Sequence, residues 1–82
     1  MILVDIWVPA MDKTYDFRLD ENMAVGSLVE EIAEAICQKE QCHLEGQTAD
    51  LTLWRLEQAL KLPKAATLRE NQVLSGEKLM LV

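Results

Sequence analysis

The sequence is short of glycine, proline, cysteine and aromatic residues. Its 82 residues include three glycines, two prolines, two cysteines and four residues that are Phe, Tyr or Trp. The glycines Gly26, Gly46 and Gly76 are isolated, which excludes a glycine-rich loop whose backbone cradles a phosphate. Half of the residues are nevertheless apolar, so the core must come from Leu, Ile, Val, Ala and Met. That apolar content is too high for a disordered chain.

Basic residues are scarce relative to acidic ones. Eight Lys and Arg residues stand against fourteen Asp and Glu residues, which gives a formal net charge of −6. This balance argues against nucleic acid as a partner, because nucleic-acid binding depends on Lys and Arg contacts to phosphate. It argues equally against anionic membrane surfaces. We interpret the charge first as a solubility feature, and the functional alternative is attraction to a basic partner.

Long apolar segments are absent as well. No run approaches the ~20 apolar residues that a membrane span requires, and residues 1–5 lack the basic region with which a signal peptide begins. We therefore expect no direct insertion into a membrane and a cytoplasmic location. A chain of this length is predicted to form a single domain over residues 1–82, with a core of marginal size.

The cysteine and histidine content predicts no catalytic residue, no metal and no cofactor. Cys37 and Cys42 fall in one predicted helix, where their spacing separates them by about 140° and disfavours a mutual disulfide. Cys37, Cys42 and His43 lack the paired short spacing of a zinc site, and two cysteines cannot hold an iron–sulfur cluster within one chain. Because sequence neighbours seldom form a nucleophile–base pair, we interpret His43 as a partner of the free carbonyl groups at the helix end.

The N-terminal segment predicts two strands joined by a hairpin turn. Residues 1–8 alternate with period two between an aliphatic face and a mixed face. The aliphatic face, expected to point toward the core, carries Ile2, Val4, Ile6 and Val8. Pro9 cannot donate to a strand ladder, so residues 9–14 should form the turn and residues 15–19 the second strand. The residues that should share one face of this second strand are Tyr15, Phe17 and Leu19.

One amphipathic helix is predicted to follow. Its apolar residues recur at spacings of three and four and form a stripe of Val25, Leu28, Val29, Ile32, Ala35 and Ile36, to which Cys37 could also belong. Two starts are compatible with the sequence. Asn22 could cap the helix, or Ser27 could cap it in a capping box in which the Glu30 side chain accepts the Ser27 N–H. We expect the helix to end near Cys42. The acidic residues of its polar side are interpreted as a solvated face, and they are Glu30, Glu31 and Glu34.

The C-terminal half predicts three further strands. A polar loop over residues 43–50 leads to a third strand at residues 51–56 and a short fourth strand at residues 60–62. The last strand spans residues 78–82. Its inward residues should be Leu79 and Leu81, and its outward residues Met80 and Val82.

The segment before the last strand is expected to pack through a short helical turn. Residues 66–71 form this turn, which Thr67 caps with Glu70 three residues on. The pair that should close onto the core is Val73 and Leu74. Gly76 is available for the positive φ of a final turn.

The order of these elements predicts the fold class. A single long helix that follows a hairpin can cover only one face of a sheet. We therefore expect an α+β protein of the ubiquitin-like β-grasp type, with a mixed sheet and one main helix packed on one face.

The spacing of these elements resembles a known family. The resemblance rests on the strand Tyr15-Asp-Phe-Arg-Leu19, the helix that begins near Val25, and the ending Leu74-Ser-Gly-Glu-Lys-Leu-Met-Leu-Val82. This pattern is similar to the YukD/EsaB group, small ubiquitin-like proteins associated with type VII secretion systems of Gram-positive bacteria. The resemblance implies a cytosolic accessory or regulatory factor. It also implies partners among the membrane-embedded secretion components, including their cytosolic ATPase or pseudokinase-like domains.

The ending of the chain bears on the mode of action. A ubiquitin-like protein that acts by conjugation or sulfur carriage needs a flexible Gly-Gly carboxylate, and residues 78–82 are an apolar strand instead. Members of the resembled group also lack that tail. We expect non-covalent binding, and the alternatives are a homo-oligomeric structural protein or a carrier that has lost its Gly-Gly tail.

The face of the sheet away from the helix is the predicted binding surface. The residues forced outward by the core-facing set are Leu3, Trp7, Thr52, Trp54, Met80 and Val82. Because the first strand should lie centrally beside the last, we expect Trp7, Trp54 and Met80 to share one patch that binds a protein partner. The alternatives are a homodimer contact and tryptophans that simply pack over the sheet. The acidic helix face is a second candidate surface for a basic partner.

Overall fold

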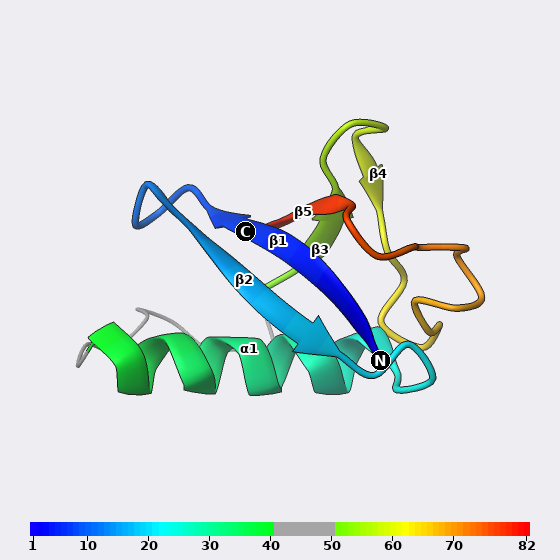
Figure 1. The fold of residues 1–82 in the computed structure, drawn as a ribbon, viewed down its shortest axis with the longest axis horizontal. Helices are drawn as coiled ribbons and strands as arrows, with labels where there is room; N and C mark the ends of the chain where they lie inside the picture. Colours follow the sequence, from blue (N-terminus) through cyan, green and yellow to red (C-terminus); the bar gives the residue numbers. More distant parts are fainter. Residues whose placement is uncertain (41–50) are drawn as a thin grey trace.

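The computed structural model describes residues 1–40 and 51–82 as a five-stranded sheet with one long helix against it (Figure 1). The elements are β1 (Ile2–Val8), β2 (Lys13–Leu19), α1 (Val25–Glu40), β3 (Leu53–Arg55), β4 (Leu60–Lys61) and β5 (Lys78–Leu81). The strand order is β2-β1-β5-β3-β4, with β1 and β5 parallel and the other neighbours antiparallel. The predicted mixed sheet with one main helix on one face is confirmed.

The core lies between α1 and the sheet face toward which alternate strand residues point. In β1, the side chains of Val4, Ile6 and Val8 are no more than 2% exposed. Strands β2, β3 and β5 bury further residues on this side, namely Tyr15, Leu19, Leu53, Leu79 and Leu81. Ile2 and Phe17, predicted on the same faces, are partly buried against the core. Because successive strand residues point to opposite faces, the same register fixes which residues point away from α1.

The helix buries nearly the predicted stripe. Its buried residues are Val25, Leu28, Val29, Ile32, Ala33 and Ile36. The prediction is wrong at Ala35, which is exposed, and Ala33 is buried in its place. At 100° per residue the two alanines lie about 80° to either side of the centre of the stripe. Periodicity therefore could not separate them, and the packing around the helix decides for Ala33.

The start of α1 differs from both predicted caps. The helix begins at Val25, which confirms the start predicted near that residue, but the predictions of Asn22 and Ser27 as capping residues are wrong. The N–H groups of Val25 and the next residue donate to the carbonyl groups of Ala66 at 2.8 Å and Lys64 at 3.0 Å. These tertiary contacts satisfy groups that a local capping side chain would otherwise satisfy.

The described end of α1 is tied to the β1–β2 hairpin. Glu40 accepts a hydrogen bond from the Tyr15 hydroxyl at 2.8 Å and pairs with the Lys13 ammonium at 3.0 Å. The predicted helix end near Cys42, and the loop over residues 43–50 with His43, lie outside the described residues.

The connection between β4 and β5 contains the predicted capping pair. The Thr67 N–H donates to Glu70 Oε1 and the Glu70 N–H donates to Thr67 Oγ1, both at 3.0 Å. Val73 is buried as predicted, whereas Leu74 is 68% exposed. The prediction of Leu74 as a core residue is wrong because the turn that follows directs it to solvent. Gly76 supplies the positive φ of that turn, at 90°.

A partly buried ion pair fastens this connection to β3. Arg55 Nη2 donates to Glu77 Oε1, and Nη1 donates to the carbonyl group of Asn71 at 3.1 Å. Glu77 Oε2 also accepts the N–H of Leu74 at 2.6 Å. Burial opposes the charged form of Glu77, but the hydrogen bonds from Arg55 and Leu74 outweigh it and hold the pKa of Glu77 below its ordinary value of 4.5.

Glu77→Gln is expected to destabilise the fold by about 1–3 kcal/mol, because it leaves the guanidinium of Arg55 without its compensating charge. Folding lowers the pKa of Glu77, so its contribution is present above the ordinary value and is lost as pH falls through the lowered value. Urea denaturation should therefore show the loss near neutral pH and a smaller loss in strong acid. The exposed Glu57→Gln is the matched control, and an equal loss in both variants would contradict the role of Glu77.

Candidate protein-binding face

The sheet face that α1 leaves uncovered carries a row of side chains that crosses the strands from β2 to β4. In the strand register, β1 residue Trp7 lies opposite Thr14 and Met80, while Trp54 lies opposite Met80 and Lys61. We call Thr14, Trp7, Met80, Trp54 and Lys61 the open-face row. The structure thus brings together the three residues that were predicted to share a patch.

The two indoles of this row are half-buried rather than freely exposed. The Trp54 Nε1–H donates to Thr52 Oγ1 at 2.9 Å, which fixes the orientation of that ring. Both tryptophans therefore pack partly against their own sheet, as the alternative interpretation expected, and still expose part of each side chain. A side chain that is held before binding loses less conformational entropy when a partner covers it.

Of the other residues predicted to face outward, two lie beside the row and the third lies away from it. Thr52 and Val82 lie beside it, and the Val82 N–H donates to the Thr52 carbonyl group at 2.9 Å. The side chain of Val82 is 43% exposed and that of Leu3 is 53% exposed. Leu3 lies four residues from Trp7 along β1, which is roughly 13 Å at the rise of a strand. It therefore lies at the far end of the open face.

Two like charges oppose each other beside the row. Asp5 of β1 lies opposite Asp16 of β2 on one side and opposite Lys78 of β5 on the other. The hydrogen bond between the two carboxyl groups, together with desolvation and the negative charge of Asp16, raises the pKa of Asp5 above its ordinary value of 3.8, whereas Lys78 lowers it. Period two along β1 places Asp5 on the face of Trp7, but only the register reveals Asp16 opposite it.

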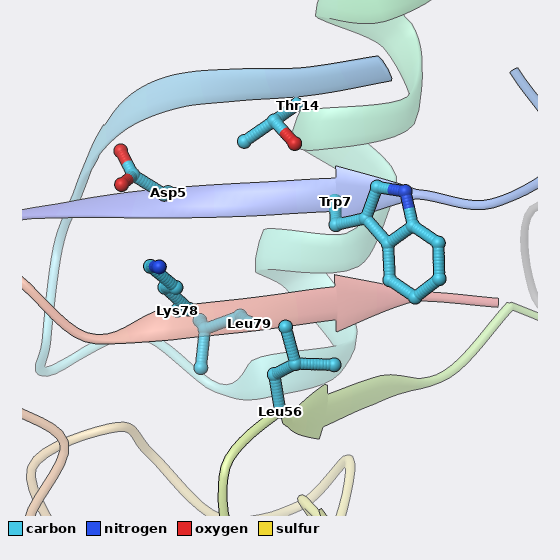
Figure 2. A pocket seen from close by; sticks show the side chains of 6 residues that line it. All are labelled: Asp5, Trp7, Thr14, Leu56, Lys78 and Leu79. Carbon is cyan, nitrogen blue, oxygen red and sulfur yellow. The ribbon is translucent and has the colours of Figure 1, made fainter. Parts of the chain in front are cut away.

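A hollow of about 410 Å³ opens on this face, lined by Asp5, Trp7, Thr14, Leu56, Lys78 and Leu79. It forms because the side chain of Leu79 is buried toward α1. At this position β5 therefore presents only its backbone to the open face. Figure 2 shows the Trp7 indole at one end of the hollow and the side chains of Asp5 and Lys78 at the other. Sequence reasoning missed the hollow, since its walls come from four separate segments.

The other candidate groups are spread over α1. Glu30, Glu31 and Glu34 are exposed, as predicted for a solvated helix face, and Cys37 is half-buried. Cys42 and His43 lie outside the described residues. Across residues 1–40 and 51–82, no group of three or more His, Cys, Asp or Glu side chains is arranged to hold a metal ion.

This strand order with one helix across it defines a ubiquitin-like protein of the α+β class, and solved structures share it. The EccD5 ubiquitin-like domain from Mycobacterium xenopi matches with a TM-score of 0.77 and 18% identity, over 99% of this chain and 91% of that one. A ubiquitin-like domain from Arabidopsis thaliana matches with a TM-score of 0.73 and 16% identity, over 99% and 74%. A ubiquitin from Caldiarchaeum subterraneum matches with a TM-score of 0.70 and 16% identity, over 98% and 89%. At these identities the likeness establishes the fold alone.

The family is established by the sequence itself. The model of the YukD protein of the WXG100 protein secretion system matches residues 3–81. The chain therefore belongs to the YukD family, and the resemblance to ubiquitin-like proteins of type VII secretion systems is confirmed. No curated protein sequence matches the chain. In the part of the chain that the structure describes, no helix has both the length and the apolar character needed to cross a membrane.

Asp16→Asn is expected to stabilise the fold near neutral pH, because it removes one of two like charges opposed across β1 and β2. Folding raises the pKa of Asp5, so this carboxyl group favours the folded state below its ordinary value of 3.8 and loses that advantage as pH rises through the raised value. The urea midpoint of the variant should exceed that of the wild type near pH 7, and the difference should close near pH 3.

Glu30→Gln is the matched control for this comparison, since it removes one charge from the exposed side of α1. It should leave the difference between neutral and acid conditions close to that of the wild type. A midpoint for Asp16→Asn below the wild-type value at neutral pH would show that the two carboxyl groups do not repel each other in the folded state.

Proposed function

We propose that this protein is a non-covalent, protein-binding ubiquitin-like module that acts as an accessory or regulatory factor of a type VII secretion system. The observation that carries the proposal is the open-face row, which aligns Trp7, Met80 and Trp54 on the side of the sheet that α1 leaves uncovered. Membership of the YukD family supports the secretion setting. We further propose that residues 1–82 act as one module in the cytoplasm, without catalytic activity or a cofactor.

The chemistry of the row supports binding. Tryptophan is enriched among the residues that dominate the energy of interfaces, and methionine adapts to irregular partner surfaces. Met80 lies between Trp7 and Trp54 on neighbouring strands, so the three side chains form one apolar strip. Its proposed border consists of Thr52 and Val82, and Leu3 is proposed to extend the binding surface at the far end of the same face.

The proposed partner is a protein. Family membership favours components of the secretion machine, and we propose the cytosolic parts of its membrane-associated members, such as ATPase or pseudokinase-like domains. The excess of acidic over basic residues disfavours nucleic acid. Non-covalent docking through the sheet face also requires no activation of the chain terminus.

Trp7→Ala and Trp54→Ala are each expected to leave the fold intact and to weaken partner binding by about 2 kcal/mol or more, roughly thirtyfold in Kd, as at an interface hot spot. The measurement is capture of partners on the tagged full chain, identified by mass spectrometry, followed by titration of the recovered partner. Leu60→Ala is the matched control because Leu60 is an exposed leucine that pairs with Arg55 rather than with the row. If both tryptophan variants bind as the wild type does, the open face is not the docking surface.

Light scattering over a concentration series distinguishes this function from homo-oligomerisation through the same face. A constant monomer mass agrees with a module for a different protein, whereas a mass that doubles with concentration and reverts in Trp54→Ala assigns the row to a homodimer. A carrier function would instead produce an adenylate on incubation with an activating enzyme and ATP.

A further inference from the structure

We propose that the hollow beside Trp7 receives an arginine side chain from the partner segment that docks on the open-face row. The inference rests on the proposed function, because it assigns the chemistry of the partner at the same face. It follows from the charges at one end of the hollow, from the shape of its walls and from the position of both beside the apolar strip.

The charges around Asp5 favour a cation. Asp5 and Asp16 are directly opposed, an unfavourable placement for two carboxylates. Among the described residues, no ion pair joins either acid to a basic side chain, although Lys78 lies opposite Asp5 in the register. A guanidinium that donates to both carboxylates would offset their repulsion in the geometry that arginine forms best. The net charge of −6 adds a long-range attraction for a basic partner.

The walls of the hollow suit the rest of the arginine side chain. The indole of Trp7 and the side chain of Leu56 are apolar surfaces against which an aliphatic stem can lie. Asp5 and Lys78 stand at the end opposite the indole (Figure 2), so a stem that enters beside Trp7 would direct its head toward the Asp5 carboxylate. A guanidinium can also stack on an indole, which an ammonium group does less well.

The location within the face makes the assignment specific. The hollow shares Trp7 and Thr14 with the open-face row, so a segment lying on the row would present a neighbouring side chain to it. The exposed acids of α1 are a weaker site for the same cation, because isolated surface ion pairs contribute little binding energy. Those acids are Glu30, Glu31 and Glu34.

The test is an NMR titration of the 15N-labelled full chain with two capped tripeptides at low salt. One is acetyl-Leu-Arg-Leu-amide, and the other carries citrulline, which has nearly the shape of arginine without its charge. We expect the arginine peptide to shift the indole N–H of Trp7 and the amides of Asp5 and Lys78, with a Kd at least about fivefold below that of the citrulline peptide. The difference should disappear in Asp5→Asn/Asp16→Asn and persist in the control Glu30→Gln/Glu34→Gln.

Three results would overturn the proposal. They are equal Kd values for the two peptides, shifts confined to α1, and no shift around the hollow up to about 10 mM peptide, a range that covers even weak contacts. Equal binding of both peptides at the row would reject the arginine assignment while leaving the docking face in place. Failure of the proposed function shows separately, as unchanged partner capture by Trp7→Ala and Trp54→Ala.

Discussion

The packing of one helix on one face of the sheet is the constraint on which the rest of this structure depends. The apolar stripe of α1 and the aliphatic sides of β1, β3 and β5 bury one another, and this burial is the main driving force for folding. Strand geometry then sends every second residue of the same strands to the opposite face. Trp7 points away from α1 because Ile6 and Val8 point toward it. The open face is thus a direct consequence of how the core forms.

The pairing of β1 with β5 turns that face into a candidate site. It places Trp7, near the start of the chain, beside Met80, near its end, and β3 adds Trp54 on the other side. The same register sets Asp5 against Asp16 and leaves a hollow above the inward-pointing Leu79. A slip of one residue would exchange the two faces of a strand. The hydrophobic core that fixes the register therefore also fixes the positions of the apolar strip and of the acidic pair.

The sequence predicted correctly those features that depend only on the repeat of a single strand or helix. Alternation in β1 and β5 and the stripe of α1 follow from the periods of strand and helix, and the outward placement of Trp7 and Met80 follows from them. The start of α1 near Val25 was predicted, but its capping was missed because the first N–H groups of the helix donate to the carbonyl groups of Lys64 and Ala66, which are remote in sequence. The exposure of Leu74 depends on a turn rather than on a period. The hollow and the acidic pair required the strand register, which periodicity leaves undetermined.

The most direct measurement of the central claim uses the two tryptophans as reporters. A chain with two tryptophans gives two indole N–H signals in a 15N-correlated NMR spectrum, one for each side of Met80. On addition of the partner that the wild-type protein captures, both indole signals should shift or broaden while the amides of Glu30, Glu31 and Glu34 keep their positions. Unchanged indole signals together with shifted helix amides would contradict the claim and place the interface on the acidic side of α1.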